Sequence, residues 1–109
     1  MKLVLVCYSG SSASILRDRM LAWARANLLD VEIIVSSLAG LDEDKEDADI
    51  VLVGPQVRCA LASVRERVPE RIPVMAVDTR DYGMAKGDRV MQAALDEIRR
   101  YKEHKIHME

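Results

Sequence analysis

Four short apolar runs are spaced along the chain and separated by longer segments. The runs are Leu3–Val6, Val31–Val35, Asp49–Val53 and Ile72–Val77. The first run has no polar alternation, which predicts a strand buried on both faces. Strands that alternate with helices pair in parallel through right-handed crossovers. We therefore predict a doubly wound α/β fold with a four-stranded parallel sheet in the order 2-1-3-4.

The segments between these runs have the periodicity of amphipathic helices. The first helix is predicted from about Ser14 to Leu28, with Ser12 or Ser14 as its N-cap. The acidic segment 39–49 predicts a solvated loop or a short surface helix. The remaining predictions are a helix over 57–68 with Cys59 as a packing residue, a polar turn at 78–83, a last helix with Met91 to Tyr101 on one face, and a frayed polar tail at 102–109.

Length and composition restrict the class of protein. The 109 residues predict one domain over 1–101 followed by the polar tail, and a formal net charge of −2 gives no reason to expect nucleic acid as a partner. The two cysteines resemble neither a disulfide framework nor a metal site, and His104 and His107 lie in the tail. With no apolar run of membrane-spanning length, no signal peptide and no sign of a cofactor, we expect a cytoplasmic protein.

Three polar segments follow three of the predicted strands. In such sheets, ligands bind at the carboxyl ends of the strands, where the strand order reverses. That point lies between the first and third strands. The segments expected to meet there are Cys7 with the loop behind it, Gly54-Pro55-Gln56, and Asp78 to Tyr82 and Gly83.

Cys7 is the candidate nucleophile. It ends the first strand and precedes a loop of small residues that leads into a helix. The loop residues are Tyr8, Ser9, Gly10, Ser11, Ser12, Ala13 and Ser14. Backbone N–H groups in such a loop and the helix N-terminus favour an anion and lower the pKa of a nearby thiol. A buried structural cysteine is the alternative, which this position disfavours.

The same loop argues against several enzyme classes. A cysteine phosphatase with the C-x5-R motif places an arginine where this chain has Ala13, and the nearest arginine is Arg17. The loop contains no carboxylic acid to activate water. A receiver domain requires aspartates where Cys7 and Gly54 stand, and a dinucleotide G-x-G-x-x-G motif is absent. The loop therefore favours a site that holds a phosphoryl group without rapid hydrolysis.

The run from Val4 to Ser14 resembles the phosphocysteine loop of enzyme IIB subunits of the phosphoenolpyruvate-dependent sugar phosphotransferase system, lactose/cellobiose type. Residues 50–58 and 77–84, with Gly87, also resemble this family, so the similarity extends over about residues 2–100. Family members commonly have a methionine in place of Ser11 and a serine or threonine in place of Ala13. Binding of phosphate by backbone N–H groups tolerates both changes.

The resemblance implies a phosphotransferase. Cys7 would accept a phosphoryl group from a histidine of enzyme IIA and pass it to a sugar held by the membrane permease, enzyme IIC. The sugar would be a β-linked disaccharide such as cellobiose, chitobiose or lactose. Gln56 and Tyr82 would border the site without an assigned step. Two other functions remain open: a cysteine phosphatase or arsenate-reductase-like enzyme, and a regulatory module without catalysis.

Overall fold

The computed structural model describes residues 1–8 and 10–108, and it describes residues 10–12 and 104–108 by their backbone alone. Within these residues, the sheet has four strands: β1 (Lys2–Val6), β2 (Glu32–Ser36), β3 (Ile50–Val53) and β4 (Val74–Ala76). All three pairings are parallel and the order is β2-β1-β3-β4. The predicted fold class and strand order are confirmed.

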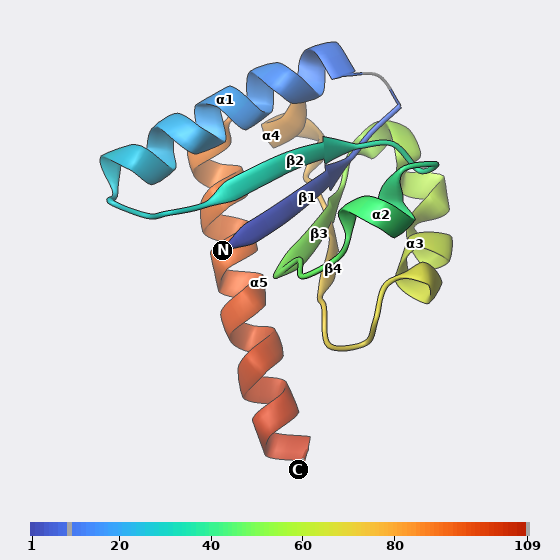
Figure 1. Ribbon diagram of the computed structural model, residues 1–109. Coiled ribbons are helices and arrows are strands. Elements are labelled where there is room, and N and C mark those ends of the chain that lie inside the picture. The colour runs from blue at the N-terminus through green and yellow to red at the C-terminus, as the bar shows by residue number, and fades with distance from the viewer. Residues whose placement is uncertain (9, 109) are drawn as a thin grey trace.

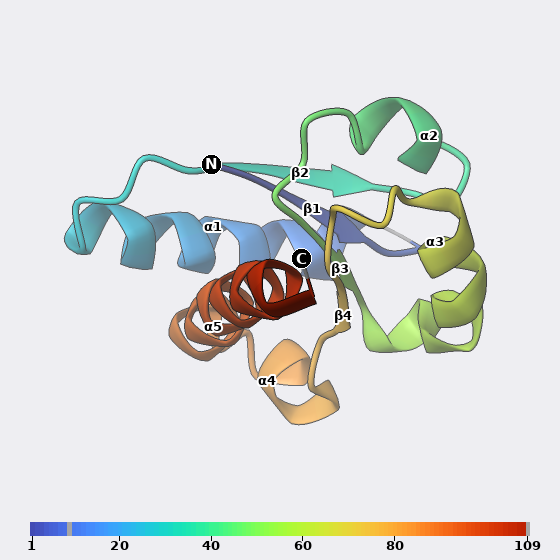
Figure 2. The same ribbon diagram turned by 90° about the horizontal axis from the view of Figure 1, so that it is seen from below.

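Helices cover both faces of this sheet (Figures 1 and 2). In chain order they are α1 (Gly10–Ala26), α2 (Leu41–Asp44), the 3-10 helix η1 (Pro55–Ala60), α3 (Leu61–Arg67), α4 (Thr79–Gly83) and α5 (Gly87–Met108). α1 and α5 lie on one face, and α2 and α3 lie on the other. The C-terminal half of α5 extends beyond the sheet.

The central strands are buried on both faces, as the absence of polar alternation predicted. Side chains of β1 alternate between two hydrophobic clusters because successive residues of a strand point to opposite sides. Leu3 and Leu5 pack toward α1 and α5, while Val4 and Val6 pack toward α2 and α3. All four have no exposed surface. The direction of the Cys7 side chain follows from this alternation.

Several predicted boundaries differ from the structure. The helix expected from Val57 begins at Pro55 as a 3-10 turn and becomes α-helical at Leu61. The polar turn at 78–83 contains a short helix, α4. The residues expected to form a frayed tail continue α5 to Met108, and β4 is shorter than predicted.

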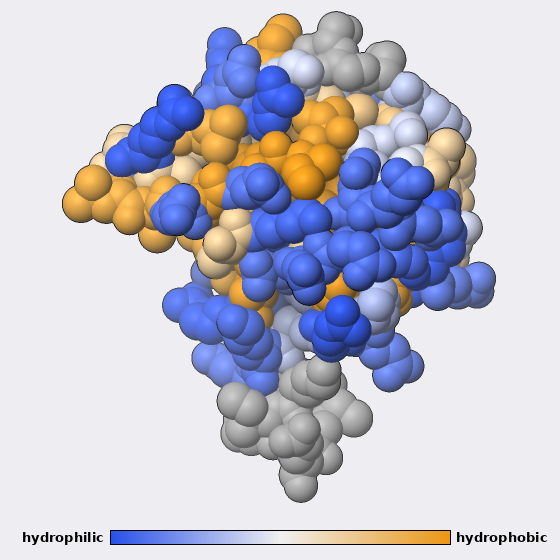
Figure 3. Space-filling view, viewed as in Figure 1, coloured by the Kyte–Doolittle hydropathy of each residue, from blue (hydrophilic) through white to orange (hydrophobic). Residues whose placement is uncertain are grey.

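Hydrophobic residues gather over α1 and β2 on one face of the molecule, whereas hydrophilic residues cover the region around α2 (Figure 3). Leu28, just after α1, is 94% exposed and has a left-handed backbone with φ 57°. The N–H groups of Leu28 and Leu29 bond back to the carbonyls of Arg25 and Ala24, which closes the end of the helix. No helix in the described part of the chain is long and apolar enough to cross a membrane.

Candidate active site

Cys7 directly follows β1 and lies at the carboxyl end of the sheet. Its N–H donates to the carbonyl of Ser36 at 2.9 Å, which extends the pairing of β1 with β2 by one residue. Its side chain points to the same face as Leu3 and Leu5 and belongs to the hydrophobic cluster beneath α1 and α5. Only 4% of the residue is exposed. Little of this residue is therefore accessible to a reactant.

Burial raises the pKa of the Cys7 thiol above its ordinary value. The prediction that the helix N-terminus lowers this pKa is wrong for the isolated chain. Transfer of a thiolate out of water into an apolar cluster disfavours its charge, and this effect dominates here. The sulfur is consequently protonated at neutral pH, so its proton must leave when it reacts.

The raised pKa predicts the pH dependence of alkylation in a Cys59→Ser background, where Cys7 is the only thiol. The rate with iodoacetamide should rise with a midpoint above about 8.5, the ordinary thiol value. Because the folded state retains this proton longer than the unfolded chain does, the free energy of unfolding should fall as pH rises from about 8.5 through the folded pKa. Mass spectrometry of quenched samples measures the rate. A midpoint below that of the urea-unfolded chain would contradict this prediction.

The helix after Cys7 begins earlier than predicted. Residues 10–14 belong to α1, so most of the expected loop is the first part of a helix. The N-cap predictions at Ser12 and Ser14 are wrong for this reason. Tyr8 is 66% exposed, and Ser9 lies outside the described residues. The first N–H groups of a helix make no bonds within it, so this end of α1 suits an anion beside Cys7.

Ala13 packs inward from this first part of α1. It is fully buried in the same cluster as Cys7. Ser14 is half-buried, and the structure describes only the backbone of Gly10, Ser11 and Ser12. The departure from the family at Ala13 therefore places a small apolar side chain against the core.

Gly54 marks the point where three segments meet. A Cβ atom on Gly54 would lie 3.1 Å from Oε1 of Gln56, 3.2 Å from the carbonyl oxygen of Val6 and 3.4 Å from Cε2 of Tyr82. The Gly54 N–H also donates to the Val6 carbonyl at 3.0 Å. The ends of β1 and β3 and the ring carried by α4 therefore converge on Gly54. A side chain at this position would press on these atoms, and they would have to shift by a few tenths of an ångström.

α4 holds Tyr82 in this position. Tyr82 is buried, with 5% of its surface exposed, and shares the cluster of Cys7. Oδ1 of Asp78 caps the helix by accepting the N–H groups of Arg80 at 2.9 Å and Asp81 at 3.0 Å. Gly83 faces open space, and a Cβ atom there would meet nothing within 4 Å. The capping role of Asp78 was not among the sequence predictions, although an aspartate before Thr-Arg-Asp matches N-cap preferences.

Replacement of Asp78 with alanine should lower the free energy of unfolding by about 1 kcal/mol, because α4 loses its cap. Urea denaturation measures the change. Asp78→Asn keeps an accepting oxygen and should recover most of the loss. Asp81→Ala is the matched control on the same helix and should have a smaller effect. If Asp78→Asn and Asp78→Ala were equally destabilised, the capping role would be wrong.

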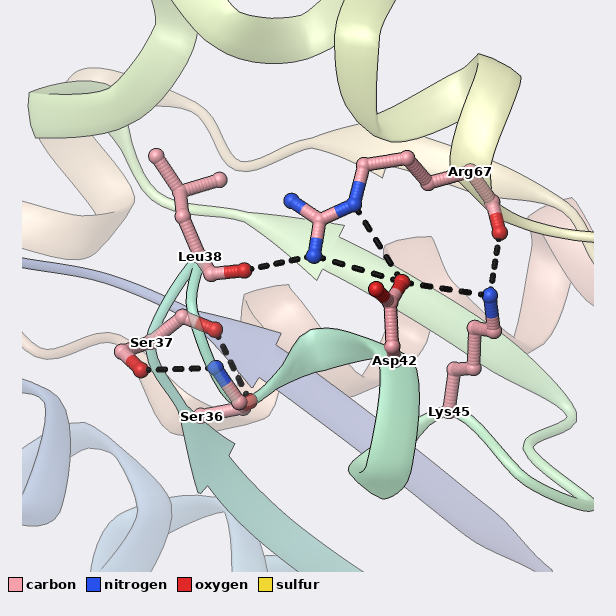
Figure 4. Close-up of polar contacts among 7 residues, drawn as sticks. Ser36, Ser37, Leu38, Asp42, Lys45 and Arg67 are labelled. Atoms are coloured by element: carbon pink, nitrogen blue, oxygen red, sulfur yellow. Dashed lines mark hydrogen bonds and ion pairs between the residues drawn. The ribbon is translucent and has the colours of Figure 1, made fainter.

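A polar cluster fixes the turn between β2 and α2 (Figure 4). Nη2 of Arg67 donates to the Leu38 carbonyl at 2.7 Å, and Nε donates to Oδ1 of Asp42 at 3.3 Å. Lys45 bonds to the same carboxylate and to the carbonyl of Arg67. Hydrogen bonding from Lys45, with a further contribution from Arg67, lowers the pKa of Asp42. This stabilisation is present above the ordinary aspartate pKa and is lost as pH falls through the lower folded value.

Two surface hollows of about 250 and 320 Å³ lie at the opposite end of the sheet. They share Ile72, Pro73 and Tyr101, which precede β4 or lie on α5, and they contain none of the predicted site residues. Among the described residues, no three His, Cys, Asp or Glu side chains lie close enough together to hold a metal ion. The N-terminus of α1 beside Cys7 is the part of the predicted site suited to an anion.

Known proteins resemble this chain in sequence and in fold. The family model for the lactose/cellobiose-specific IIB subunit of the PTS system matches residues 2–93. The chain belongs to this family. It is a phosphotransfer subunit of a sugar phosphotransferase system, and hence a phosphotransferase.

Several relatives of this IIB chain have named substrates. It is 33% identical to the galactose-specific EIIB component of Lactococcus lactis subsp. cremoris, over 84% of this chain and 91% of that one. It is also 33% identical to the cellobiose-specific component of Lactococcus lactis subsp. lactis, with the same coverage. The oligo-beta-mannoside-specific component of Bacillus subtilis is 33% identical, over 86% of this chain and 92% of that one.

Solved structures of the family have the same fold. The cellobiose-specific IIB component of Borrelia burgdorferi matches with a TM-score of 0.77 and 29% identity, over 93% of this chain and 94% of that one. The lactose-specific IIB domain of Streptococcus pneumoniae matches with a TM-score of 0.73 and 17% identity, over 89% and 96% of the two chains. At 17% identity, the second match shows the fold alone.

Cys59 was predicted to be a packing residue, and this prediction is wrong. It is exposed on η1 and does not pack in the core, whereas Val57 on the same 3-10 helix is buried. A 3-10 helix has three residues per turn, which changes the side chains that face inward. The chain therefore has a second, accessible thiol, which provides a natural control for experiments on Cys7.

Proposed function

We propose that Cys7 is the residue that carries the phosphoryl group. Membership of the IIB family and the position of Cys7 between the end of β1 and the N-terminus of α1 support this assignment. Cys59, in contrast, lies near the end of η1, where the chain continues directly into α3. The single observation that carries the proposal is that Cys7 is the cysteine beside the helix end that suits an anion.

The transfer exchanges one bond to phosphorus for another. The sulfur of Cys7 attacks the phosphorus of a phosphohistidine on enzyme IIA, the S–P bond forms, and the P–N bond breaks. The thiol proton passes to the imidazole nitrogen that leaves, so the protonated state of buried Cys7 suits this step. In the second transfer, a sugar hydroxyl attacks the phosphorus and the S–P bond breaks. The hydroxyl proton returns to sulfur.

The surroundings of Cys7 favour retention of the phosphoryl group over its hydrolysis. N–H groups at the start of α1 would bind its oxygens. The position six residues after Cys7 is Ala13, which is buried and supplies no cation. The carboxylate of Asp78, just before α4, accepts two N–H groups as a helix cap. These features support a carrier rather than a phosphatase.

Exposed apolar side chains lie on α1, just before α1 and just after α4, and we call them the rim. Tyr8, Ile15 and Met84 are more than half exposed, at 66%, 54% and 56%. Arg19, one turn after Ile15, bonds to the carbonyl of Met84, which brings α4 beside α1. Aromatic residues and methionines are enriched in protein interfaces. We assign this rim to enzyme IIA and, in alternation, to the membrane permease enzyme IIC, because both must reach the same sulfur.

The sugar is proposed from the relatives. Those named above include components specific for cellobiose and for oligo-beta-mannosides, which are β-linked sugars. We propose a β-linked disaccharide of this kind, with cellobiose as the first to test and chitobiose and lactose as the next. The sugar is bound by the permease and meets this chain only through its phosphorylated Cys7. The reaction would take place on the cytoplasmic side of the membrane.

A reconstituted first transfer tests the proposal. The chain is mixed with phosphorylated enzyme IIA of a lactose/cellobiose system, and intact-protein mass spectrometry should show one added phosphoryl group. Iodine, which cleaves thiophosphates, should remove it. Cys59→Ser should behave like the native chain, and Cys7→Ser should remain unmodified. Release of inorganic phosphate with no stable adduct would favour a phosphatase, and an adduct on Cys7→Ser would overturn the assignment.

A further inference from the structure

The start of α5 touches the backbone of α1. A Cβ atom on Gly87 would lie 2.5 Å from the carbonyl carbon of Arg19 and 2.6 Å from the nitrogen of Met20. No side chain can fit between these atoms without a shift of one helix. Gly87 therefore fixes the start of α5 against the middle of α1, whose own first turn adjoins Cys7.

Arg19 makes a second connection at the same place. Its Nη1 donates to the carbonyls of Met84 and Ala85, each at 3.4 Å. Ala85 has a left-handed backbone with φ 51°, which a residue with a side chain adopts at some cost. The N–H of Lys86 donates to the Asp81 carbonyl at 2.8 Å. The short connection between α4 and α5 is thus held in one conformation against α1.

This connection determines where α4 places Tyr82. The N–H of Ala85 donates to the Tyr82 carbonyl at 3.1 Å. This hydrogen bond links the backbone of Tyr82 directly to the connection between α4 and α5. The Tyr82 ring lies beside Gly54 and belongs to the buried cluster of Cys7. Tyr82 is the other titratable residue of that cluster. Cys7 and the Tyr82 side chain carried by α4 therefore belong to one buried cluster.

We propose that Arg19 and Gly87 are positioning residues that hold Tyr82 beside Cys7 and keep water from the sulfur and from the phosphoryl group it carries. This inference rests on the proposed function of Cys7. Neither residue touches the reacting atoms. Loss of the contact loosens α4, admits water at the site, and leaves the helix end of α1 in place.

The first test compares Arg19→Gln and Gly87→Ala with Arg25→Gln, an exposed arginine on the last turn of the same helix. All variants carry Cys59→Ser. The pH midpoint of Cys7 alkylation should fall by at least about half a unit in Arg19→Gln, because the thiol becomes better solvated. The alkylation midpoint of Gly87→Ala should fall further if this variant folds. The midpoint of Arg25→Gln should equal that of the parent. Arg19→Gln alone decides the test if Gly87→Ala does not fold.

A second measurement separates positioning from a merely structural role. The phosphorylated chains are freed from donor, and the release of inorganic phosphate is followed without an acceptor. Arg19→Gln should lose its phosphoryl group several times faster than Arg25→Gln. Combination of Arg19→Gln with Tyr82→Leu should give no further increase over Tyr82→Leu alone, because both act through the same ring. A lower melting temperature with an unchanged midpoint and an unchanged rate of loss would overturn the proposal.

The two proposals fail in different ways. If the native chain accepts no phosphoryl group on Cys7, the proposed function fails, and the alkylation midpoints still report whether Arg19 positions Tyr82. If the native chain is phosphorylated on Cys7 and Arg19→Gln equals the parent in both measurements, the positioning role fails alone.

Discussion

Replacement of Cys7 with serine should abolish sugar phosphorylation, with a loss of at least about 10³-fold in rate. A serine hydroxyl is a far weaker nucleophile than a thiol, and no general base is assigned beside it. Serine has nearly the same volume, so the cluster beneath α1 should still fold. The rate is measured as sugar phosphate formed from phosphoenolpyruvate, with the general phosphotransferase proteins, enzyme IIA and membranes that contain the permease.

Cys59→Ser is the matched control for this experiment. Cys59 is exposed on η1, so its loss should leave both the rate and the free energy of unfolding near the native values. If Cys59→Ser removed the activity and Cys7→Ser retained it, the roles of the two thiols would be exchanged. Circular dichroism of both variants establishes that a lost rate does not reflect a lost fold.

Gly54→Val should also have a large effect. We expect it to lower the free energy of unfolding by about 2 kcal/mol. Its Cβ would stand 3.2 Å from the carbonyl oxygen of Val6, which is fixed by a backbone hydrogen bond, and its methyl groups would press on Tyr82 and Gln56. Displacement of the Tyr82 ring should also slow phosphoryl transfer. Urea denaturation and the transfer assay measure the two effects.

Gly83→Ala provides the comparison for Gly54→Val. Both glycines were predicted to border the site, but a Cβ on Gly83 would meet nothing within 4 Å. Its replacement should change stability by less than about 0.5 kcal/mol. Equal losses in the two variants would show that close approach at Gly54 is not the cause.

The sheet was predictable because its determinants are local. Runs such as Leu3–Val6 and Ile50–Val53 are apolar on both sides, and this pattern alone requires helices on each face. The edge at which Cys7 lies then follows from the direction of parallel strands. The segments that follow these parallel strands were expected to meet at this edge. Val6, Gln56 and Tyr82 do meet there, around Gly54.

The start of α1 was not predictable in the same way. Serine is a weak helix former and a strong N-cap, so a run with several serines offers several possible starts. α4 is too short for periodicity to reveal, and its formation depends on the cap from Asp78 and the burial of Tyr82. The inward face of the segment after Gly54 changes with the 3-10 geometry of η1, which exposes Cys59.

The direction of the pKa shift of Cys7 could not be predicted from its position in the sequence. A thiol before a helix suggests a lowered pKa, while its burial in the hydrophobic cluster beneath α1 and α5 raises it. The direction depends on how much water reaches the sulfur, which is a property of packing between segments distant in sequence. A protonated thiol still suits transfer from phosphohistidine, because the imidazole that leaves takes up a proton.

The most direct test of the carrier role is a single-turnover chase. The chain is phosphorylated by enzyme IIA, purified from it, and mixed with cellobiose and membranes that contain the permease. We expect sugar phosphate to appear in an amount equal to the phosphoryl group lost from the tryptic peptide Leu3–Arg17, which contains Cys7. Release of the group as inorganic phosphate, or its retention on the chain while sugar phosphate fails to form, would contradict the carrier role.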